Sequence, residues 1–123
     1  MNSISTQKAP AALGPYSQAV MKDNFLFISG QLGIDPNTGK LATTFTEQAE
    51  LVFSHLEHIL KEARMSFENV VKATIFVDDM KNFPTLNSIY GKYFTEPFPA
   101  RETVQVAKLP ANGSVEISLI AIK

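Results

Sequence analysis

Apolar residues recur at steps of three and four over residues 46–64, which is the spacing of one face of an α-helix. Thr44 and Glu47 form a capping-box pattern at the start of this stretch, where side chains satisfy free backbone amides. A second stripe with the same spacing covers residues 83–94. The pattern therefore predicts two amphipathic helices.

Four segments have the length and composition of β-strands, because aromatic, aliphatic and β-branched residues dominate them. They cover residues 24–32, 70–77, 101–109 and 114–122. The turn sequence Pro110-Ala111-Asn112-Gly113 separates the last two, so we expect these two to pair as an antiparallel hairpin. Residues 17–21 are expected to pair with the strand at 24–32 through a tight turn, and a further short strand is expected near Ile4.

This order of strands and helices predicts an α+β sheet with both helices on one face, in a single domain over residues 1–123. The strands at 70–77 and 114–122 carry apolar residues on both of their faces. Two helices cover only one face, and the other face would leave an apolar patch that soluble monomers seldom expose. We therefore predict an oligomer in which partner copies cover the second face.

Composition narrows the function classes further. The 11 lysines and arginines against 12 aspartates and glutamates give a net charge of -1, which offers no electrostatic footprint for nucleic acid. No cysteine is present, so thiolate metal sites and cysteine nucleophiles are excluded. His55 and His58 lie outside the apolar stripe of the first helix, and we expect both on the surface. Without a membrane span or signal-peptide pattern, we expect a soluble cytoplasmic protein.

Two charged residues stand inside apolar strand patterns. Arg101 follows Phe98-Pro99-Ala100 at the entrance of a strand, where its guanidinium could bind a carboxylate through two parallel hydrogen bonds. The alternative is a structural ion pair with Glu102 or a neighbouring chain. Glu116 lies between Val115 and Ile117 and could orient or deprotonate a water molecule. The alternative for Glu116 is a solvated position on a half-exposed sheet.

Small and hydroxyl residues lie beside two strand ends, at Gly14-Pro15-Tyr16-Ser17 and at Ser29-Gly30-Gln31. Glycine allows a ligand to approach the backbone closely. Equally, these glycines could mark only a turn and a β-bulge.

Several stretches of the chain together resemble the RidA family, formerly called YjgF. They are residues 9–20 (APAALGPYSQAV), 27–41 (FISGQLGIDPNTGKL), 70–80 (VVKATIFVDDM), 98–110 (FPARETVQVAKLP) and 115–122 (VEISLIAI). The resemblance implies a chorismate-mutase-like α+β fold, with a mixed sheet, two helices on one face, and a homotrimeric barrel with ligand clefts between subunits. It also implies hydrolysis of 2-iminobutanoate and 2-iminopropanoate to 2-oxo acids and ammonia, without a cofactor or a metal.

The resemblance also implies roles for individual residues. Arg101 would clamp the substrate carboxylate, and Glu116 would hold or activate water. Substrate-binding positions of the family fall on Tyr16, Ser29, Gly30, Asn87, Tyr90 and Thr103. Thr103 replaces a cysteine found in many relatives but keeps the backbone carbonyl that acts there, and Ser118 replaces a frequent second glutamate.

Two other functions remain open at this point. A ligand-sensing regulatory module would bind 2-oxo acids in the same cleft without turnover. An endoribonuclease or translation inhibitor, another description attached to this family, is less well supported because the chain has no basic patch and only two arginines.

Overall fold

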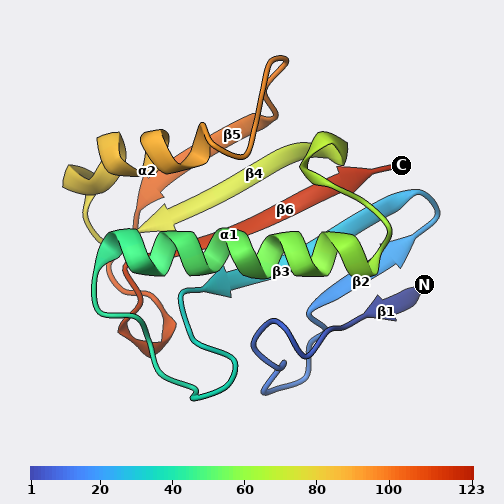
Figure 1. Cartoon of the computed structure of the whole chain (residues 1–123), viewed down its shortest axis with the longest axis horizontal. Coiled ribbons are helices and arrows are strands. Elements are labelled where there is room, and N and C mark those ends of the chain that lie inside the picture. The colour runs from blue at the N-terminus through green and yellow to red at the C-terminus, as the bar shows by residue number, and fades with distance from the viewer.

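The computed structural model describes all 123 residues and consists of one six-stranded mixed sheet with two α-helices on one face (Figure 1). The order of strands in the sheet is β1-β2-β3-β6-β4-β5. The elements are β1 (Asn2–Ile4), β2 (Ala19–Lys22), β3 (Phe25–Leu32), α1 (Phe45–Glu62), β4 (Val70–Val77), α2 (Phe83–Tyr90), β5 (Ala100–Gln105) and β6 (Val115–Ile122). Three single-turn 3₁₀ helices cover Phe67–Asn69, Met80–Asn82 and Pro110–Asn112. The predicted order of elements is confirmed.

Local sequence signals explain the first half of the fold. β2 and β3 form the predicted hairpin, with Lys22 opposite Phe25 and Asp23 in the left-handed region at φ 53°. Short polar residues such as Asp tolerate this conformation better than bulky ones. Thr44 caps α1 as predicted, because its Oγ1 accepts a hydrogen bond of 3.1 Å from the Glu47 amide.

The second helix is shorter than predicted. α2 ends at Tyr90, four residues before the end of the expected span, and Gly91 is its C-cap. The chain then continues in turns, in which Phe94 N donates to Tyr90 O at 3.3 Å. Tyr93 stacks on Phe53 of α1 with the two ring centroids 4.5 Å apart. These turns pack Tyr93 and Phe94 against the core beside α1, so the helical spacing of apolar residues continues beyond the end of α2.

The expected hairpin of the last two strands is wrong. β5 pairs only with β4, in parallel, while β6 lies between β3 and β4 and is antiparallel to both. The helix α2 carries the chain over the sheet between β4 and β5, as parallel neighbours require. Hydrophobicity explains the placement, since β6 is buried at every second residue and suits the centre of a sheet. β5 (ARETVQ) is mostly exposed and suits its edge.

The sheet face opposite the helices carries a large apolar surface, as the sequence predicted. The side chains of Lys72, Thr74, Glu102, Glu116 and Ser118 form the polar part of this face. Residues of β3 alternate, with Leu26 and Ile28 buried toward the helices and Phe25 and Phe27 exposed. By register, this open face also holds the following side chains: Val20, Phe76, Val104, Ile120 and Ile122. Neither α1 nor α2 combines the length and the hydropathy that crossing a membrane would require.

The expectation that both histidines lie on the surface is wrong for His55. Its side chain is 1% exposed, and its Nε2 lies 2.8 Å from the carbonyl oxygen of Ile34. The loop that follows β3 packs over this flank of α1, which the helical pattern alone did not reveal. Burial lowers the pKa of His55. His58 is half-buried.

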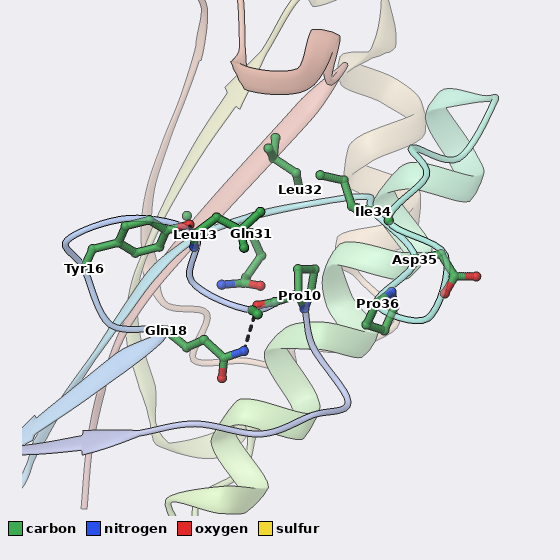
Figure 2. A pocket seen from close by; sticks show the side chains of 12 residues that line it. Pro10, Leu13, Tyr16, Gln18, Gln31, Leu32, Ile34, Asp35 and Pro36 are labelled. Atoms are coloured by element: carbon green, nitrogen blue, oxygen red, sulfur yellow. Dashed lines mark hydrogen bonds between the residues drawn. The ribbon is translucent and has the colours of Figure 1, made fainter.

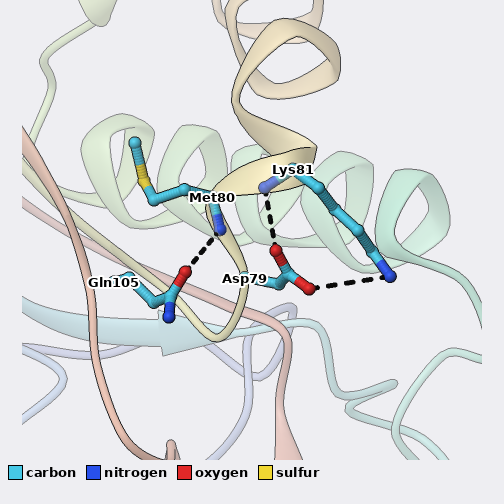
Figure 3. A network of polar contacts seen from close by, with 4 residues as sticks. All are labelled: Asp79, Met80, Lys81 and Gln105. Atoms are coloured by element: carbon cyan, nitrogen blue, oxygen red, sulfur yellow. Dashed lines mark hydrogen bonds and ion pairs between the residues drawn. The ribbon is translucent and has the colours of Figure 1, made fainter.

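Polar contacts fix the entry to α2 (Figure 3). The Asp79 carboxylate accepts a hydrogen bond of 2.9 Å from the Lys81 amide and lies 3.6 Å from Lys81 Nζ. The Met80 amide donates to Gln105 Oε1 at 2.8 Å, which ties this turn to the end of β5. These contacts set α2 against β5, where Arg101 lies.

Candidate functional site

Arg101 has no carboxylate partner within this chain. Its Nη2 donates to Asn87 Oδ1 at 2.7 Å, and its guanidinium carbon lies 4.7 Å from the ring centroid of Tyr90 and 5.5 Å from that of Phe83. Glu102, the partner considered from the sequence, instead pairs with Lys72 at 3.0 Å. The internal ion pair is therefore absent, and the remaining N–H groups of Arg101 are available for a ligand.

Tyr90 provides the surface on which Arg101 rests. Burial raises the pKa of the Tyr90 phenol, and the Arg101 charge opposes this rise. The phenol oxygen is buried and has no hydrogen-bond partner. An aromatic face attracts a cation, so the stacking holds the guanidinium in a fixed plane.

A cavity of about 300 Å³ opens beside this arginine. It is lined by Asn87, Tyr90, Gly91, Phe98, Pro99 and Arg101. Three residues that the sequence singled out, namely Asn87, Tyr90 and Arg101, therefore meet in one place. A free guanidinium in an otherwise uncharged cavity is suited to binding a small carboxylate.

Glu116 and Gly30 meet on the open face of the sheet. A Cβ placed on Gly30 would lie 2.7 Å from the carboxyl carbon of Glu116, so only glycine leaves room for this carboxylate. Glu116 makes no hydrogen bond or ion pair within the chain, and its partial burial raises its pKa. The β-bulge that was the alternative role for Gly30 is also present, since the register shifts between Ile28 and Gln31.

Tyr16 and Gly30 both line a second cavity, of about 320 Å³ (Figure 2). Tyr16 is 56% exposed and projects from the loop before β2. Ser29 does not line this cavity, and its Oγ donates to Ser17 O at 2.6 Å. The structure thus gives Ser29 a role in joining the bulge of β3 to the loop that carries Tyr16.

Thr103 lies on the same face of β5 as Arg101, because it is two residues further along the strand. Its Oγ1 is buried without a hydrogen-bond partner. Ser118 lies on β6 two residues after Glu116 and opposite Thr74 of β4.

Arg101 and Glu116 lie on opposite faces of the sheet. Arg101 is paired with Ala73, whose side chain is buried toward the helices. Glu116 is paired with Phe76, which is three residues further along β4 and therefore faces the open side. No residue lines both cavities. A single chain therefore presents two separate halves of the predicted site.

Sequence reasoning missed four buried polar residues, two of which line the second cavity while two bind the loop after β3. Gln18 Nε2 donates to Pro10 O at 2.7 Å and so holds the N-terminal loop (Figure 2). Gln31 lines the cavity, and Gln48 and His55 bind the loop after β3. The sequence pattern marks only Gln48, which is three residues after Phe45 and four before Val52 and so falls on the apolar face of α1. No three aspartate, glutamate or histidine side chains gather closely enough to bind a metal ion.

Comparison with known proteins places the chain in a family. Residues 6–123 match the family described as Endoribonuclease L-PSP. The crystal structure of RidA from an Antarctic Psychrobacter species aligns over 100% of both chains, with a TM-score of 0.97 and 46% sequence identity. The chain belongs to the RidA family. The α+β fold predicted from the resemblance, with two helices on one face of a mixed sheet, is therefore confirmed.

Other RidA-family relatives are equally similar. A RutC family protein of Aquifex aeolicus is 51% identical over 125 residues, which cover all of both chains. The 2-iminobutanoate/2-iminopropanoate deaminase of Bos taurus is 50% identical over 121 residues, covering 98% of this chain and 88% of that protein.

The raised pKa of Glu116 predicts how stability depends on pH. Between the ordinary value of 4.5 and the raised value, the folded state binds more protons than the unfolded state, so stability falls as pH rises. Glu116→Gln does not titrate at this position. We therefore expect its Tm to exceed that of the wild type at pH 7 and to equal it near pH 4, in thermal unfolding followed by circular dichroism.

The control for this experiment is Glu62→Gln, at the exposed end of α1. The Tm difference between Glu62→Gln and the wild type should not grow as the pH rises from 4 to 7. A Glu116→Gln protein that is less stable than the wild type at pH 7 would contradict the assignment of Glu116 as a partially buried carboxylate without a partner.

Proposed function

We propose that this chain is a deaminase that hydrolyses 2-iminobutanoate and 2-iminopropanoate to 2-oxo acids and ammonia. The observation that carries the proposal is the unpaired guanidinium of Arg101 in a small cavity, in a chain half-identical to a 2-iminobutanoate/2-iminopropanoate deaminase. These substrates are short 2-imino acids, each with one carboxylate. A fixed guanidinium without an internal counter-charge is the group required to bind them.

Arg101 is proposed to bind the carboxylate and so to place the adjacent imine carbon. Asn87 and Tyr90 hold the guanidinium from two sides, which limits its motion before the substrate arrives. The imine carbon is already electrophilic when its nitrogen is protonated, so the reaction needs no covalent nucleophile.

Glu116 is proposed to orient the attacking water, with Gly30 providing space beside its carboxylate. Water adds to the imine carbon, and a proton passes to the nitrogen. The resulting carbinolamine loses ammonia and leaves the 2-oxo acid. The backbone carbonyl of Thr103 is proposed to accept a hydrogen bond from the water or the imine nitrogen. Tyr16 is proposed to complete the wall around the substrate, and Ser29 is proposed to hold the loop that carries Tyr16 through its hydrogen bond to Ser17 O.

The two halves of the site are proposed to come from neighbouring copies in a homotrimer. Arg101 and Glu116 cannot meet within one chain, since they face opposite sides of the sheet. The apolar open face, with Phe27 43% exposed, provides a surface for association. Rotational symmetry would then repeat one mixed site at each contact between copies.

A coupled assay tests the activity. Threonine and a threonine dehydratase supply 2-iminobutanoate, and the wild type should accelerate release of 2-oxobutanoate above the spontaneous rate. Arg101→Ala should lower this acceleration roughly 100-fold or more, because a charge-assisted contact to the substrate is lost. Lys61→Ala, on the exposed face of α1, is the control and should retain full activity. A wild type that binds 2-oxobutanoate without any acceleration would instead favour a regulatory binding module.

A mixing experiment tests whether the site is shared. Arg101→Ala and Glu116→Gln should each be inactive alone. After joint dissociation and reassembly, random trimers should regain about a quarter of the wild-type activity, because some contacts then combine an intact Arg101 with an intact Glu116. Mass spectrometry can verify that mixed trimers formed. Mixed trimers that remain inactive would rule out a site that is shared in this way.

Phe27→Asp tests whether the open face holds the oligomer together. The side chain is already partly exposed in the single chain, so the fold should survive while a buried carboxylate disrupts association. We expect a monomer by light scattering, an unchanged circular dichroism spectrum and loss of activity. Lys61→Asp, on the outer face of α1, should remain oligomeric and active. An oligomeric and active Phe27→Asp protein would place the interface elsewhere.

A further inference from the structure

Gln48 lies at a junction of three elements. It stands in the first turn of α1 and is only 3% exposed. The loop after β3 and the start of β6 both reach it. A polar side chain so deeply buried in an apolar stripe requires hydrogen-bond partners, and the positions of those partners indicate its role.

Both ends of the Gln48 amide are engaged. Its Nε2 donates to the Ala42 carbonyl at 3.0 Å, and its Oε1 accepts from the Ser114 amide at 2.8 Å. Ala42 in turn donates its own amide to Gly33 O at 2.9 Å. One side chain thus joins the end of the β3 loop to the residue immediately before β6.

The junction lies where β3 and β6 separate. The ladder between them ends at the pair Leu32 and Glu116, and beyond it Gly33 turns toward the helix. A Cβ on Gly33 would lie 2.5 Å from the Gln48 Cα, so the chain rests directly against α1. On the β6 side, a Cβ on Gly113 would lie 2.9 Å from Leu32 Cδ2. Glu116 is therefore at the last β3 pair before these two strands diverge. Beyond this pair the sheet holds β6 only on its β4 side, where Val115 is opposite Val77 and Asp78 N donates to Ser114 O at 3.1 Å.

We propose that Gln48 is a positioning residue that fixes the start of β6 and thereby the placement of the Glu116 carboxylate beside Gly30. The proposal rests on the function proposed above for Glu116. Only Val115 separates Ser114 from Glu116, and loss of the Gln48 hydrogen bond would free the Ser114 amide at the end of this short segment. A misplacement of about 1 Å at a reacting group can cost a large factor in rate.

His55 distinguishes this role from general support of the fold. It lies seven residues further along α1, on the same helix face, and is as deeply buried as Gln48. It also binds the loop after β3, through Ile34 O at 2.8 Å, but it has no hydrogen bond to β6. Variants at the two positions therefore both weaken the loop, whereas only Gln48 variants also remove a hydrogen bond to the residue that precedes β6.

The experiment compares Gln48→Met, Gln48→Glu and His55→Phe with the wild type. Gln48→Met preserves the approximate shape and removes both hydrogen bonds, whereas Gln48→Glu retains an acceptor for the Ser114 amide. Tm, the deaminase kcat and KM, and binding of 2-oxobutanoate are measured for each. We expect Gln48→Met to lose kcat roughly 10- to 100-fold, with KM and 2-oxobutanoate binding within about twofold, since Arg101 binds the carboxylate.

Gln48→Glu is expected to recover much of the lost kcat, and His55→Phe to lower Tm while retaining kcat. Nuclear magnetic resonance of labelled glutamate carboxyls supplies a readout independent of turnover. The pKa of Glu116 should move toward its ordinary value in Gln48→Met and should stay unchanged in His55→Phe. Equal kcat losses in Gln48→Met and His55→Phe, or an unmoved Glu116 pKa in Gln48→Met, would overturn the proposal. If the wild type had no deaminase activity but the pKa of Glu116 still moved in Gln48→Met, only the proposed deaminase function would be overturned.

Discussion

The position of β6 in the middle of the sheet is the constraint on which the rest of the site depends. Paired with β3 on one side and β4 on the other, this strand can direct Glu116 only to the open face. Arg101, on the edge strand β5, is directed to the helix face by the same alternation. The alternation of side chains therefore places Arg101 and Glu116 on opposite faces of one sheet, although the proposed reaction needs both at one substrate. Association of copies is proposed to bring Arg101 of one chain to Glu116 of another.

Neither charged group has an oppositely charged partner within the chain. Arg101 rests on aromatic rings and an amide, and Glu116 is partly buried beside a glycine. A charged side chain without an oppositely charged partner is in a less favourable environment than one in an ion pair. Unpaired charges of this kind are typical of sites that are preorganised for a ligand. A cavity of about 300 Å³ is lined by Arg101, and one of about 320 Å³ is lined by Gly30, the neighbour of Glu116.

The sequence predicted most of the fold because local signals carried it. The Thr44 cap, the turn at Asp23 and the alternation in β6 are properties of neighbouring residues. The predicted pairing of β5 with β6 was wrong, because strands that are neighbours in sequence were assumed to be neighbours in the sheet. The mostly exposed residues of β5 indicated an edge strand instead. The sequence also identified Arg101 and Glu116, but it could not show that they face apart. That fact depends on long-range register.

The most direct test of this account is a crystal structure of the protein with 2-oxobutanoate bound. The account predicts a ligand carboxylate hydrogen-bonded to Arg101 of one copy, with the ligand's carbonyl carbon facing Glu116 of a neighbouring copy. A ligand bound within a single chain, or at a place that Arg101 does not reach, would contradict it.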